Sequence, residues 1–239
     1  MPVESVIARL EEIASSLPSD DGVGCFTRLY LDVTRSVQRE LAESTFADPQ
    51  FLVRLDVGFA GLYLDAVSAS TRDPRSIPRA WAPLFEARKR SGIAPLQFAF
   101  AGMNAHINRD LPVALVACCR ELGIEPADAT PQHRDFERVN DLLARVESSV
   151  KQRYLGGTLR ALDRLLHRVD RIDDVVAMWD VRRAREAAWT NGLALWALRD
   201  EPTLSARYVA VLDRTVGLAG RGLLQPADTW LQRLARAIR

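Results

Sequence analysis

Apolar residues recur along most of this chain at the three- and four-residue spacing of an α-helix. In the first segment Val6, Leu10, Ile13 and Leu17 fall on one helical face, and acidic residues stand between them. An apolar stripe with this period can be buried on one side only if the segment is helical. Alternating apolar and polar runs joined by hairpin turns, which indicate strands, are missing. The sequence therefore predicts an all-α fold.

Signals for helix ends divide the chain into separate helices. Asp48-Pro49 and Thr130-Pro131 each place a capping side chain before a proline at the first helical position, and Gly123 is suited to end a helix. The connections are short, so we expect one all-helical domain over residues 1–239, a bundle of about ten helices. The expected ranges are 3–17, 22–44, 49–70, 79–91, 94–107, 111–122, 131–154, 157–171, 173–199, 202–220 and 226–238.

Composition excludes several classes of protein. The 239 residues include 32 Lys and Arg and 31 Asp and Glu, so the net charge is only +1 and attracts neither nucleic acid nor an anionic membrane. No stretch is long and apolar enough to span a membrane, and the N-terminus lacks the pattern of a signal peptide. The three cysteines form no disulfide framework. We expect a cytoplasmic monomer or homodimer.

The segment FAFAGMNAHINRDLPVALVACC, residues 98–119, carries the polar stretch HINRD between two apolar halves. Buried polar side chains without partners are unfavourable, so these should bond one another, bind a ligand, or lie at a bend. The pattern predicts two buried helices joined by a polar hinge, with Asp110 capping the second helix ahead of Pro112. His106 continues the apolar face of the first helix, and Gly102 one turn earlier leaves space beside it.

Three further polar side chains fall on predicted core faces. Asp56 lies on a helical stripe of Leu, Phe and Tyr side chains within residues 52–66. In the helix predicted from residue 131, His133 and Asn140 share the side that carries Phe136. A carboxylate on a core face must be paired, metal-bound, or protonated with a raised pKa. Because polar side chains occur on the apolar faces of several separate helices, we expect these side chains to meet near the hinge in one buried site.

One interpretation of this site is a metal centre. His106 and Asp110 form an H-x-x-x-D pair, which places imidazole and carboxylate on one face of a continuous helix. His133 and Asp56 would complete a ligand set for one divalent ion such as zinc. The stretch HINRDLP resembles the H-x-x-x-D elements of helical zinc phospholipases and their related nucleases. The further histidine-rich elements of those families are absent from a sequence with three histidines, so their trinuclear cluster is not expected.

The other interpretation is a metal-free acid/base site. His106 or His133 would transfer the proton, Asp56 or Asp110 would orient that histidine, and Asn140 or an arginine would stabilise developing negative charge. Aromatic and long side chains on the neighbouring helices would form a pocket for an apolar small molecule. The residues expected to bind this substrate are Tyr63, Met103, Arg182, Arg185 and Trp189.

The leading functional hypothesis is therefore an enzyme that acts on a fairly apolar small molecule by hydrolysis, elimination or cyclisation, with or without one divalent metal. The alternative is a non-catalytic helical module that binds an apolar ligand or a partner helix. In that alternative His106 and Asp110 only stabilise the core. Convergence of His106, Asp110 and Asp56 on an open cavity would favour the enzyme.

Several stretches between residues 46 and 199 resemble one actinobacterial family. They are FLVRLDVGFAGLY, AWAPLFEAR, IAPLQFAFAGMNAHINRDLPVALV, DFERVNDLL and the late helix rich in Trp and Arg, and AGMNAHINRDLP is the most specific of them. The family is domain of unknown function 5995. The resemblance implies a family domain and carries no activity with it.

Overall fold

The computed structural model describes residues 3–43, 46–140, 143 and 180–226. This part of the chain is helical and contains no strand, which confirms the all-α prediction. Residues 131–140 are helical in addition to the elements with both ends described. Those elements are α1 (Val3–Ser16), α2 (Gly22–Glu43), α3 (Pro49–Arg72), η1 (Pro74–Ser76), α4 (Ala82–Ala87), α5 (Pro95–Ala105), η2 (His106–Asp110), α6 (Leu111–Leu122), α9 (Val181–Ala197) and α10 (Pro202–Leu223).

Three of the predicted helix ends are confirmed in atomic detail. The Asp48 side chain accepts a hydrogen bond of 3.0 Å from the backbone N–H of Phe51, and Pro49 is the first residue of α3. Thr130 accepts one of 3.1 Å from the backbone N–H of His133. Gly123 ends α6 with φ of 65°, a left-handed conformation that glycine adopts without strain.

Other predicted boundaries are wrong or untested. The helix expected over 79–91 is shorter in the structure and corresponds to α4. Within the range 173–199, α9 begins at Val181, because Asp180 is extended and its side chain caps α9 by accepting a hydrogen bond from the backbone N–H of Arg183. The helix expected over 157–171 lies outside the described residues. So does the one over 226–238 beyond its first residue.

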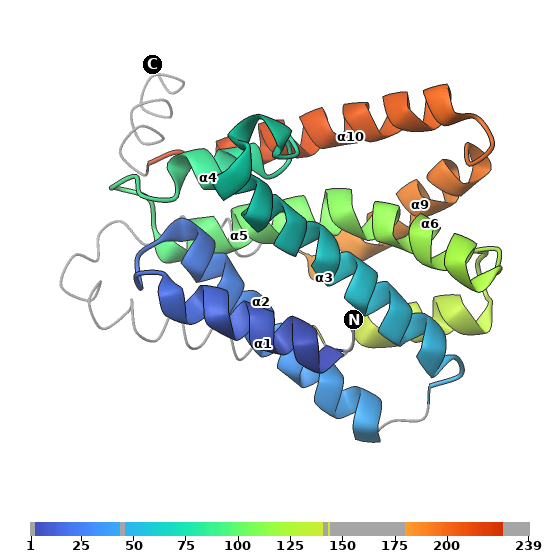
Figure 1. Ribbon diagram of the computed structural model, residues 1–239. Helices are drawn as coiled ribbons and strands as arrows, with labels where there is room; N and C mark the ends of the chain where they lie inside the picture. Colours follow the sequence, from blue (N-terminus) through green and yellow to red (C-terminus); the bar gives the residue numbers. More distant parts are fainter. Residues whose placement is uncertain (1–2, 44–45, 141–142, 144–179, 227–239) are drawn as a thin grey trace, which may run out of the picture.

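The centre of the fold is a rod in which α5, η2 and α6 follow one another without interruption (Figure 1). α5 buries eight of its 11 residues, so it is apolar nearly all round. A helix of this kind must be covered on every side. α2, α3, α9 and α10 all contact the rod. The apolar half-segments on either side of HINRD are thus the core of the molecule.

The predicted hinge is wrong, because η2 is one turn of π-helix that carries α5 directly into α6. The backbone N–H of Leu111 bonds to the carbonyl of His106, five residues earlier. In a regular α-helix the ring of Pro112 would collide with the carbonyl four residues before it. The wider π turn relieves that collision without ending the helix. Single π turns are rare and are frequent at functional sites.

Gly102 lets α2 approach the rod closely. A Cβ atom built on Gly102 would lie 2.3 Å from the ring of Phe26, far inside van der Waals contact. Phe26 thereby fills the space expected beside this glycine and places its ring within reach of His106. The position of α2, which forms one wall of the site, depends on this contact.

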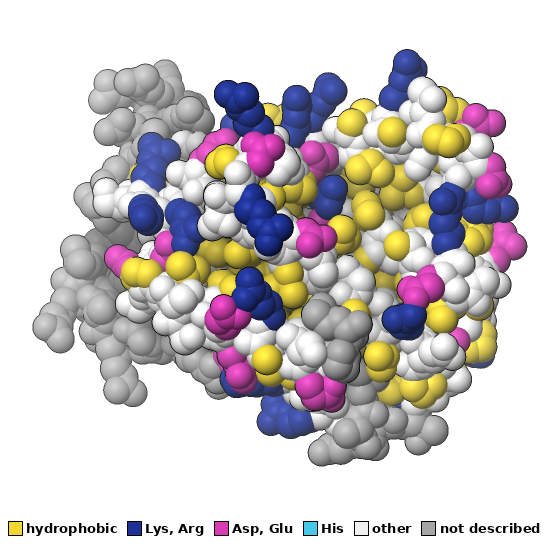
Figure 2. All heavy atoms as spheres, in the orientation of Figure 1, with side chains coloured by type: hydrophobic (Ala, Val, Ile, Leu, Met, Phe, Trp, Pro, Cys, Tyr) yellow, Lys and Arg dark blue, Asp and Glu magenta, His cyan; other side chains and the backbone are white. Residues whose placement is uncertain are grey.

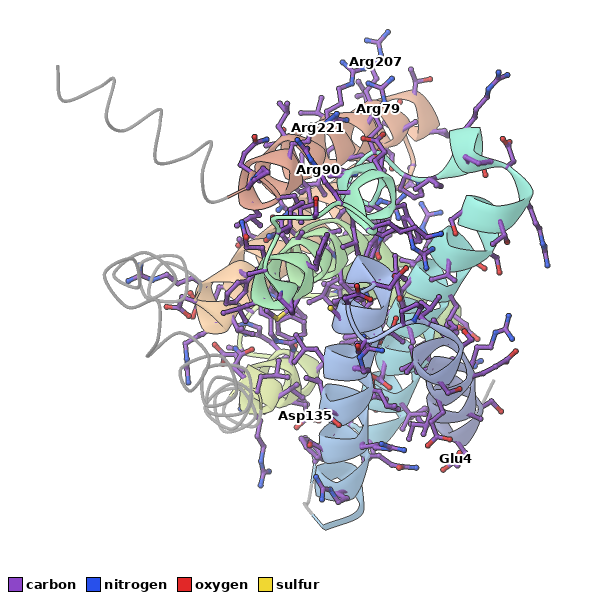
Figure 3. All side chains as sticks on the ribbon, turned by 90° about the vertical axis from the view of Figure 1, so that its left-hand side faces the viewer. Glu4, Arg79, Arg90, Asp135, Arg207 and Arg221 are labelled. Carbon is purple, nitrogen blue, oxygen red and sulfur yellow. The ribbon has the colours of Figure 1, made fainter. Side chains whose placement is uncertain are left out.

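The surface shows mixed charge, in keeping with the small net charge. On the face drawn in Figure 2, basic and acidic side chains are interspersed with apolar ones. Figure 3 shows Arg79, Arg90, Arg207 and Arg221 projecting outwards around α4 and α10. None of the described helices is both long enough and apolar enough to cross a membrane.

Candidate functional site

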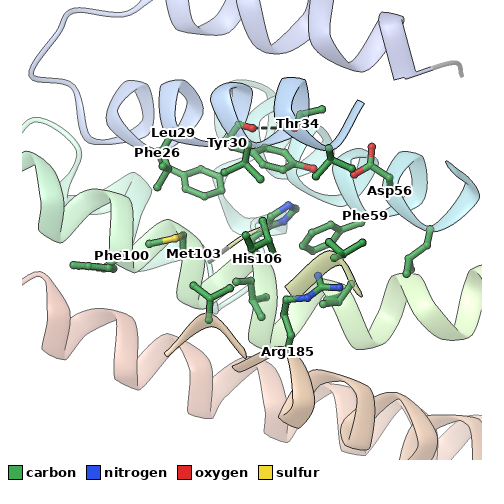
Figure 4. Close-up of a pocket in the computed structure, with 18 of the residues that line it drawn as sticks. Phe26, Leu29, Tyr30, Thr34, Asp56, Phe59, Phe100, Met103, His106 and Arg185 are labelled. Atoms are coloured by element: carbon green, nitrogen blue, oxygen red, sulfur yellow. Dashed lines mark hydrogen bonds between the residues drawn. The ribbon is translucent and has the colours of Figure 1, made fainter. Parts of the chain in front are cut away.

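A largely apolar cavity lies where the central rod meets α2, α3, α9 and the helical segment 131–140 (Figure 4). Its volume is about 130 Å³, comparable with an engineered protein cavity of about 150 Å³ that binds benzene. Aliphatic and aromatic side chains form most of the wall. Four lining residues can carry a charge or exchange a proton: Tyr30, Asp56, His106 and Arg185. The cavity thus combines an apolar interior with a few polar groups, as small-molecule sites do.

His106 enters the cavity wall from the first position of the π turn. Its ring stacks on Phe59 with 3.5 Å between ring centroids and 9° between planes, and Tyr30 meets it edge-on at 4.4 Å. Phe26, Tyr63 and Trp81 complete a ring of aromatic neighbours. Burial lowers the pKa of His106, and the nearby Asp110 carboxylate opposes this only in part. The imidazole is therefore neutral at neutral pH.

Asp110 determines which imidazole nitrogen carries the proton. Nδ1 of His106 lies 3.3 Å from Oδ2 of Asp110, whose side chain is fully buried. Asp110 also accepts hydrogen bonds from Nε1 of Trp81 at 2.9 Å and from Nη1 of Arg109 at 2.8 Å. Because a carboxylate can only accept, the neutral imidazole carries its proton on Nδ1 and leaves Nε2 as the acceptor. Catalytic histidines are oriented by a carboxylate in the same way.

The predicted capping role of Asp110 is wrong. Its side chain makes no capping hydrogen bond to α6, since the helix continues backwards through η2 and the first amides have partners there. Asp110 does not line the cavity and stands behind His106. The carboxylate therefore acts on the cavity through His106.

Asp56 reaches the cavity from α3, and one of its oxygens lacks a partner. Oδ2 of Asp56, Oη of Tyr30 and Nε2 of His106 are all buried and receive no hydrogen bond from any described residue. Burial raises the pKa of Asp56 to about 6, while the positive charge of Arg185 acts in the opposite direction. Asp56 therefore changes protonation state close to neutral pH. The three residues that carry these unpartnered atoms all line one cavity.

Arg185 reaches the opposite part of the wall from α9. Its Nε donates to Oδ1 of Asn140 at 2.5 Å, and its Nη2 donates to the carbonyl of Phe136 at 3.1 Å. The guanidinium carbon lies 4.1 Å from the centroid of the Phe136 ring. Burial lowers the pKa of Arg185 to about 9, which leaves it cationic at neutral pH. Asn140, expected in the site from its core position, thus acts by holding Arg185.

His133 and Trp189 lie together and do not line the cavity, so the structure does not bring them to His106 as expected. Their rings stack with 4.6 Å between centroids. Nδ1 of His133 accepts from the backbone N–H of Ala129, and the indole of Trp189 donates to Asp128. Trp189 is buried, whereas His133, expected on a core face, is only half-buried.

Of the other residues predicted to bind substrate, some line the cavity and some do not. Met103 lines the cavity. Tyr63 is fully buried and does not line the cavity, and its hydroxyl lies 2.6 Å from that of Thr27. Arg182 is exposed, one helical turn before Arg185 on α9, and does not line the cavity in which it was expected to bind substrate.

The residues present do not fit the predicted zinc site. Within the described ranges, no three His, Cys, Asp or Glu side chains are grouped so as to hold a metal ion. His133 lies with Trp189, and the Asp110 oxygens are bonded to Trp81 and Arg109. The pair of His106 and Asp110 is therefore a hydrogen-bonded dyad in this fold.

Sequence reasoning missed Tyr30 and Trp81 as parts of the site. Tyr30 lies one turn after Phe26 on the buried face of α2, with a spacing that also describes an ordinary core residue. Trp81 stands in the turn before α4, distant in sequence from the Asp110 carboxylate that its indole reaches. No pattern in the sequence distinguishes these two from other core aromatics.

Comparison with known proteins identifies a family and no activity. The model of the Family of unknown function (DUF5995) matches residues 3–226. No curated protein matches the chain, and no solved structure does.

Proposed function

We propose that this chain, which belongs to the Family of unknown function (DUF5995), binds a small, largely apolar molecule in the cavity and acts on it by acid/base chemistry. The observation that carries the proposal is the set of unpartnered atoms: Oη of Tyr30, Oδ2 of Asp56 and Nε2 of His106. Buried polar groups in native proteins normally have partners. A bound molecule with a polar group would supply them here.

The roles follow from the charge states. His106, held by Asp110 with Nε2 unprotonated, is the base. Asp56 exchanges a proton near neutral pH, which suits a second acid or base. Arg185 places a positive charge at the cavity wall, where it would stabilise negative charge that develops during the reaction. Hydrolysis, elimination and cyclisation can each use a base, a second acid or base, and a positive charge placed in this way.

Ligand binding is tested first, with phenol as a ring-sized probe. Adding phenol to the ¹⁵N-labelled protein should shift the amide resonances of residues around the cavity. Val33→Phe, which fills the cavity from α2, should abolish the shifts. Val211→Phe, at a position 61% exposed on α10, is the matched control and should leave them unchanged. Absence of localised shifts in the unmodified protein would refute the proposed binding.

The acid/base reaction is tested with p-nitrophenyl acetate, an ester with one small ring. His106→Gln should lower kcat/KM by about 10² or more, the contribution expected of a general base. His133→Gln is the matched control, because His133 stacks on Trp189 away from the cavity. Equal rates for the unmodified protein and His106→Gln would exclude His106 as the base.

A second candidate function is binding without chemistry. The observation that favours it is the stacking of Phe59 on His106, which buries Nε2 beneath a ring. Phenol binding with no turnover of any probe, together with an unchanged His106 resonance in the bound state, would support this candidate over the enzyme.

The state of the cysteines and the small net charge bear on the cellular setting of the protein. Cys25, Cys118 and Cys119 are all free and buried, which suits the reducing cytoplasm. The near-zero net charge gives no reason to expect a nucleic acid or membrane partner. We therefore propose a cytoplasmic protein, with residues 1–239 forming one domain as a monomer or homodimer.

A further inference from the structure

We infer that the ligand of this cavity is a small amphiphilic carboxylate, whose charged head binds Arg185 and whose apolar part occupies the rest of the cavity. The inference rests on the proposed binding at this site and names the class of molecule bound.

Arg185 is unlike the other described arginines. It is the one arginine in this part of the chain that is buried, with 6% of its surface exposed. The others lie at or near the surface, as Arg79, Arg90 and Arg207 do in Figure 3. A buried cation is normally paired with an anion. No carboxylate of the described residues lies within 4 Å of Arg185, so the charge of Asp56 acts on it only from a longer distance, and its hydrogen-bond acceptors, Asn140 and the Phe136 carbonyl, are neutral.

The two hydrogen bonds hold the guanidinium in a defined orientation. They engage Nε and one side of Nη2, and no described residue accepts a hydrogen bond from Nη1. In Figure 4 the guanidinium points from α9 towards Phe59, across the cavity. Free donors on the two terminal nitrogens form the planar fork that a carboxylate accepts with both oxygens. A ligand carboxylate would therefore supply the contacting anion that Arg185 lacks among the described residues.

Asp56 is compatible with an anionic ligand because it can become neutral. The titratable groups that face the same cavity are Tyr30 from α2, His106 from η2 and Arg185 from α9. Arg185 keeps its charge across the physiological pH range, whereas Asp56 takes up a proton near pH 6. When a ligand carboxylate neutralises Arg185, protonated Asp56 and the Tyr30 hydroxyl become hydrogen-bond donors towards it. Binding of the anion is therefore coupled to uptake of a proton.

The cavity is also polar at one end and apolar at the other. In Figure 4, Asp56 and Arg185 lie at one end, whereas Leu29, Phe100 and Met103 lie towards the other. A molecule with a charged head and a short apolar chain or ring matches this distribution. The volume of about 130 Å³ limits the apolar part to roughly six carbon atoms.

Three probes with the same six-carbon chain test the head group: hexanoate, 1-hexanol and hexylamine, measured by calorimetry at pH 6 and pH 8. At pH 6 the affinity for hexanoate should be at least about tenfold higher than the affinity for 1-hexanol. At pH 8 the affinity for hexanoate should be at least about tenfold lower than at pH 6. Hexylamine, a cation at both pH values, should bind no better than 1-hexanol.

Variants then assign the head-group contact. Arg185→Met should remove the advantage of hexanoate while 1-hexanol still binds, and Arg182→Met, one turn away at an exposed position, is the matched control. Arg185→Lys keeps the positive charge but lacks the planar pair of donors, so it should reduce the difference in affinity between hexanoate and 1-hexanol. This variant tests the contact if Arg185→Met fails to fold. Asp56→Asn should keep hexanoate binding and remove its dependence on pH.

The outcomes separate the two proposals. If 1-hexanol binds and hexanoate binds no better, the carboxylate class is wrong and the cavity remains a ligand site. If hexylamine binds most tightly, Asp56 is the head-group partner and the inference is overturned. If phenol and all three hexyl probes fail to bind the unmodified protein, the proposed function is overturned as well.

Discussion

Nδ1 of His106 lies 3.3 Å from Oδ2 of Asp110, within a single π turn at the centre of the fold. Trp81 and Arg109 bond to the same carboxylate, so the orientation of His106 depends on a network that ties η2 to the turn before α4. The Nδ1 atom of the imidazole is thereby held by the core, while Nε2 has no hydrogen-bond partner among the described residues.

Asp110→Asn should destabilise the protein strongly. The substitution removes the charge that Arg109 and His106 face at a position with no exposure. Breaking a buried charged network of this kind costs about 3–5 kcal/mol. Urea unfolding measures the loss, and Asp200→Asn, whose side chain is 85% exposed, should change stability by less than about 0.5 kcal/mol. Similar effects for the two variants would contradict a structural role for the network.

Asp56→Asn should stabilise the protein at neutral pH. The folded pKa of Asp56, about 6, is above the ordinary value of 3.8, so the folded state holds a proton that the unfolded state releases. Ionisation of Asp56 therefore lowers stability as the pH rises from 4 through 6, by up to about 3 kcal/mol at pH 7.5. Because the Asp56 residue as a whole is only half-buried, we expect Asp56→Asn to recover about 1–2 kcal/mol at this pH.

The same difference should fall to roughly a third of its size at pH 4.5, where Asp56 is protonated in the folded protein but already largely ionised in the unfolded chain. Urea unfolding of both proteins between pH 4.5 and pH 7.5 tests this. Asp65→Asn, exposed on the same helix, should change stability by less than about 0.5 kcal/mol. A stability difference between Asp56→Asn and the unmodified protein that does not change with pH would rule out the raised pKa.

His106 should be a neutral imidazole protonated on Nδ1 at pH 7, because burial lowers its pKa and Asp110 accepts the Nδ1 proton. Long-range ¹H–¹⁵N correlation spectra distinguish the two tautomers and the imidazolium directly. Detection of protons on both nitrogens at pH 7 would mean that Asp110 outweighs burial, and His106 could not then act as a base.

Gly102→Ala and Gly58→Ala should have opposite effects. A Cβ at Gly102 would meet the Phe26 ring at 2.3 Å, and such overpacking costs about 1–3 kcal/mol. A Cβ at Gly58, in the middle of α3, would meet nothing within 4 Å, so alanine should stabilise that helix by about 0.5–1 kcal/mol. Thermal unfolding compares them. A stable Gly102→Ala protein would show that α2 does not need this close contact.

Much of the fold could be predicted because its signals are local. The period of the apolar residues, the Asp48 cap and the glycine after α6 act within one or two helical turns, and the structure agrees with them. The hinge was predicted wrongly because a proline after a polar stretch usually marks a new helix. A π turn accommodates the same proline without ending the helix, and no local signal in the sequence distinguishes it from the start of a new helix.

The sequence by itself determined that this chain is helical, that HINRD lies between two buried helices, and that Asp56 and Asn140 lie on faces turned towards the core. These follow from periodicity and from the free energy of burying apolar side chains. Only the tertiary structure decided which buried faces meet: it joined Asp56, His106 and Arg185 at one cavity and placed His133 with Trp189. The reason is physical, since a helical stripe specifies which side of a helix is covered, while the packing of all the helices specifies what covers it.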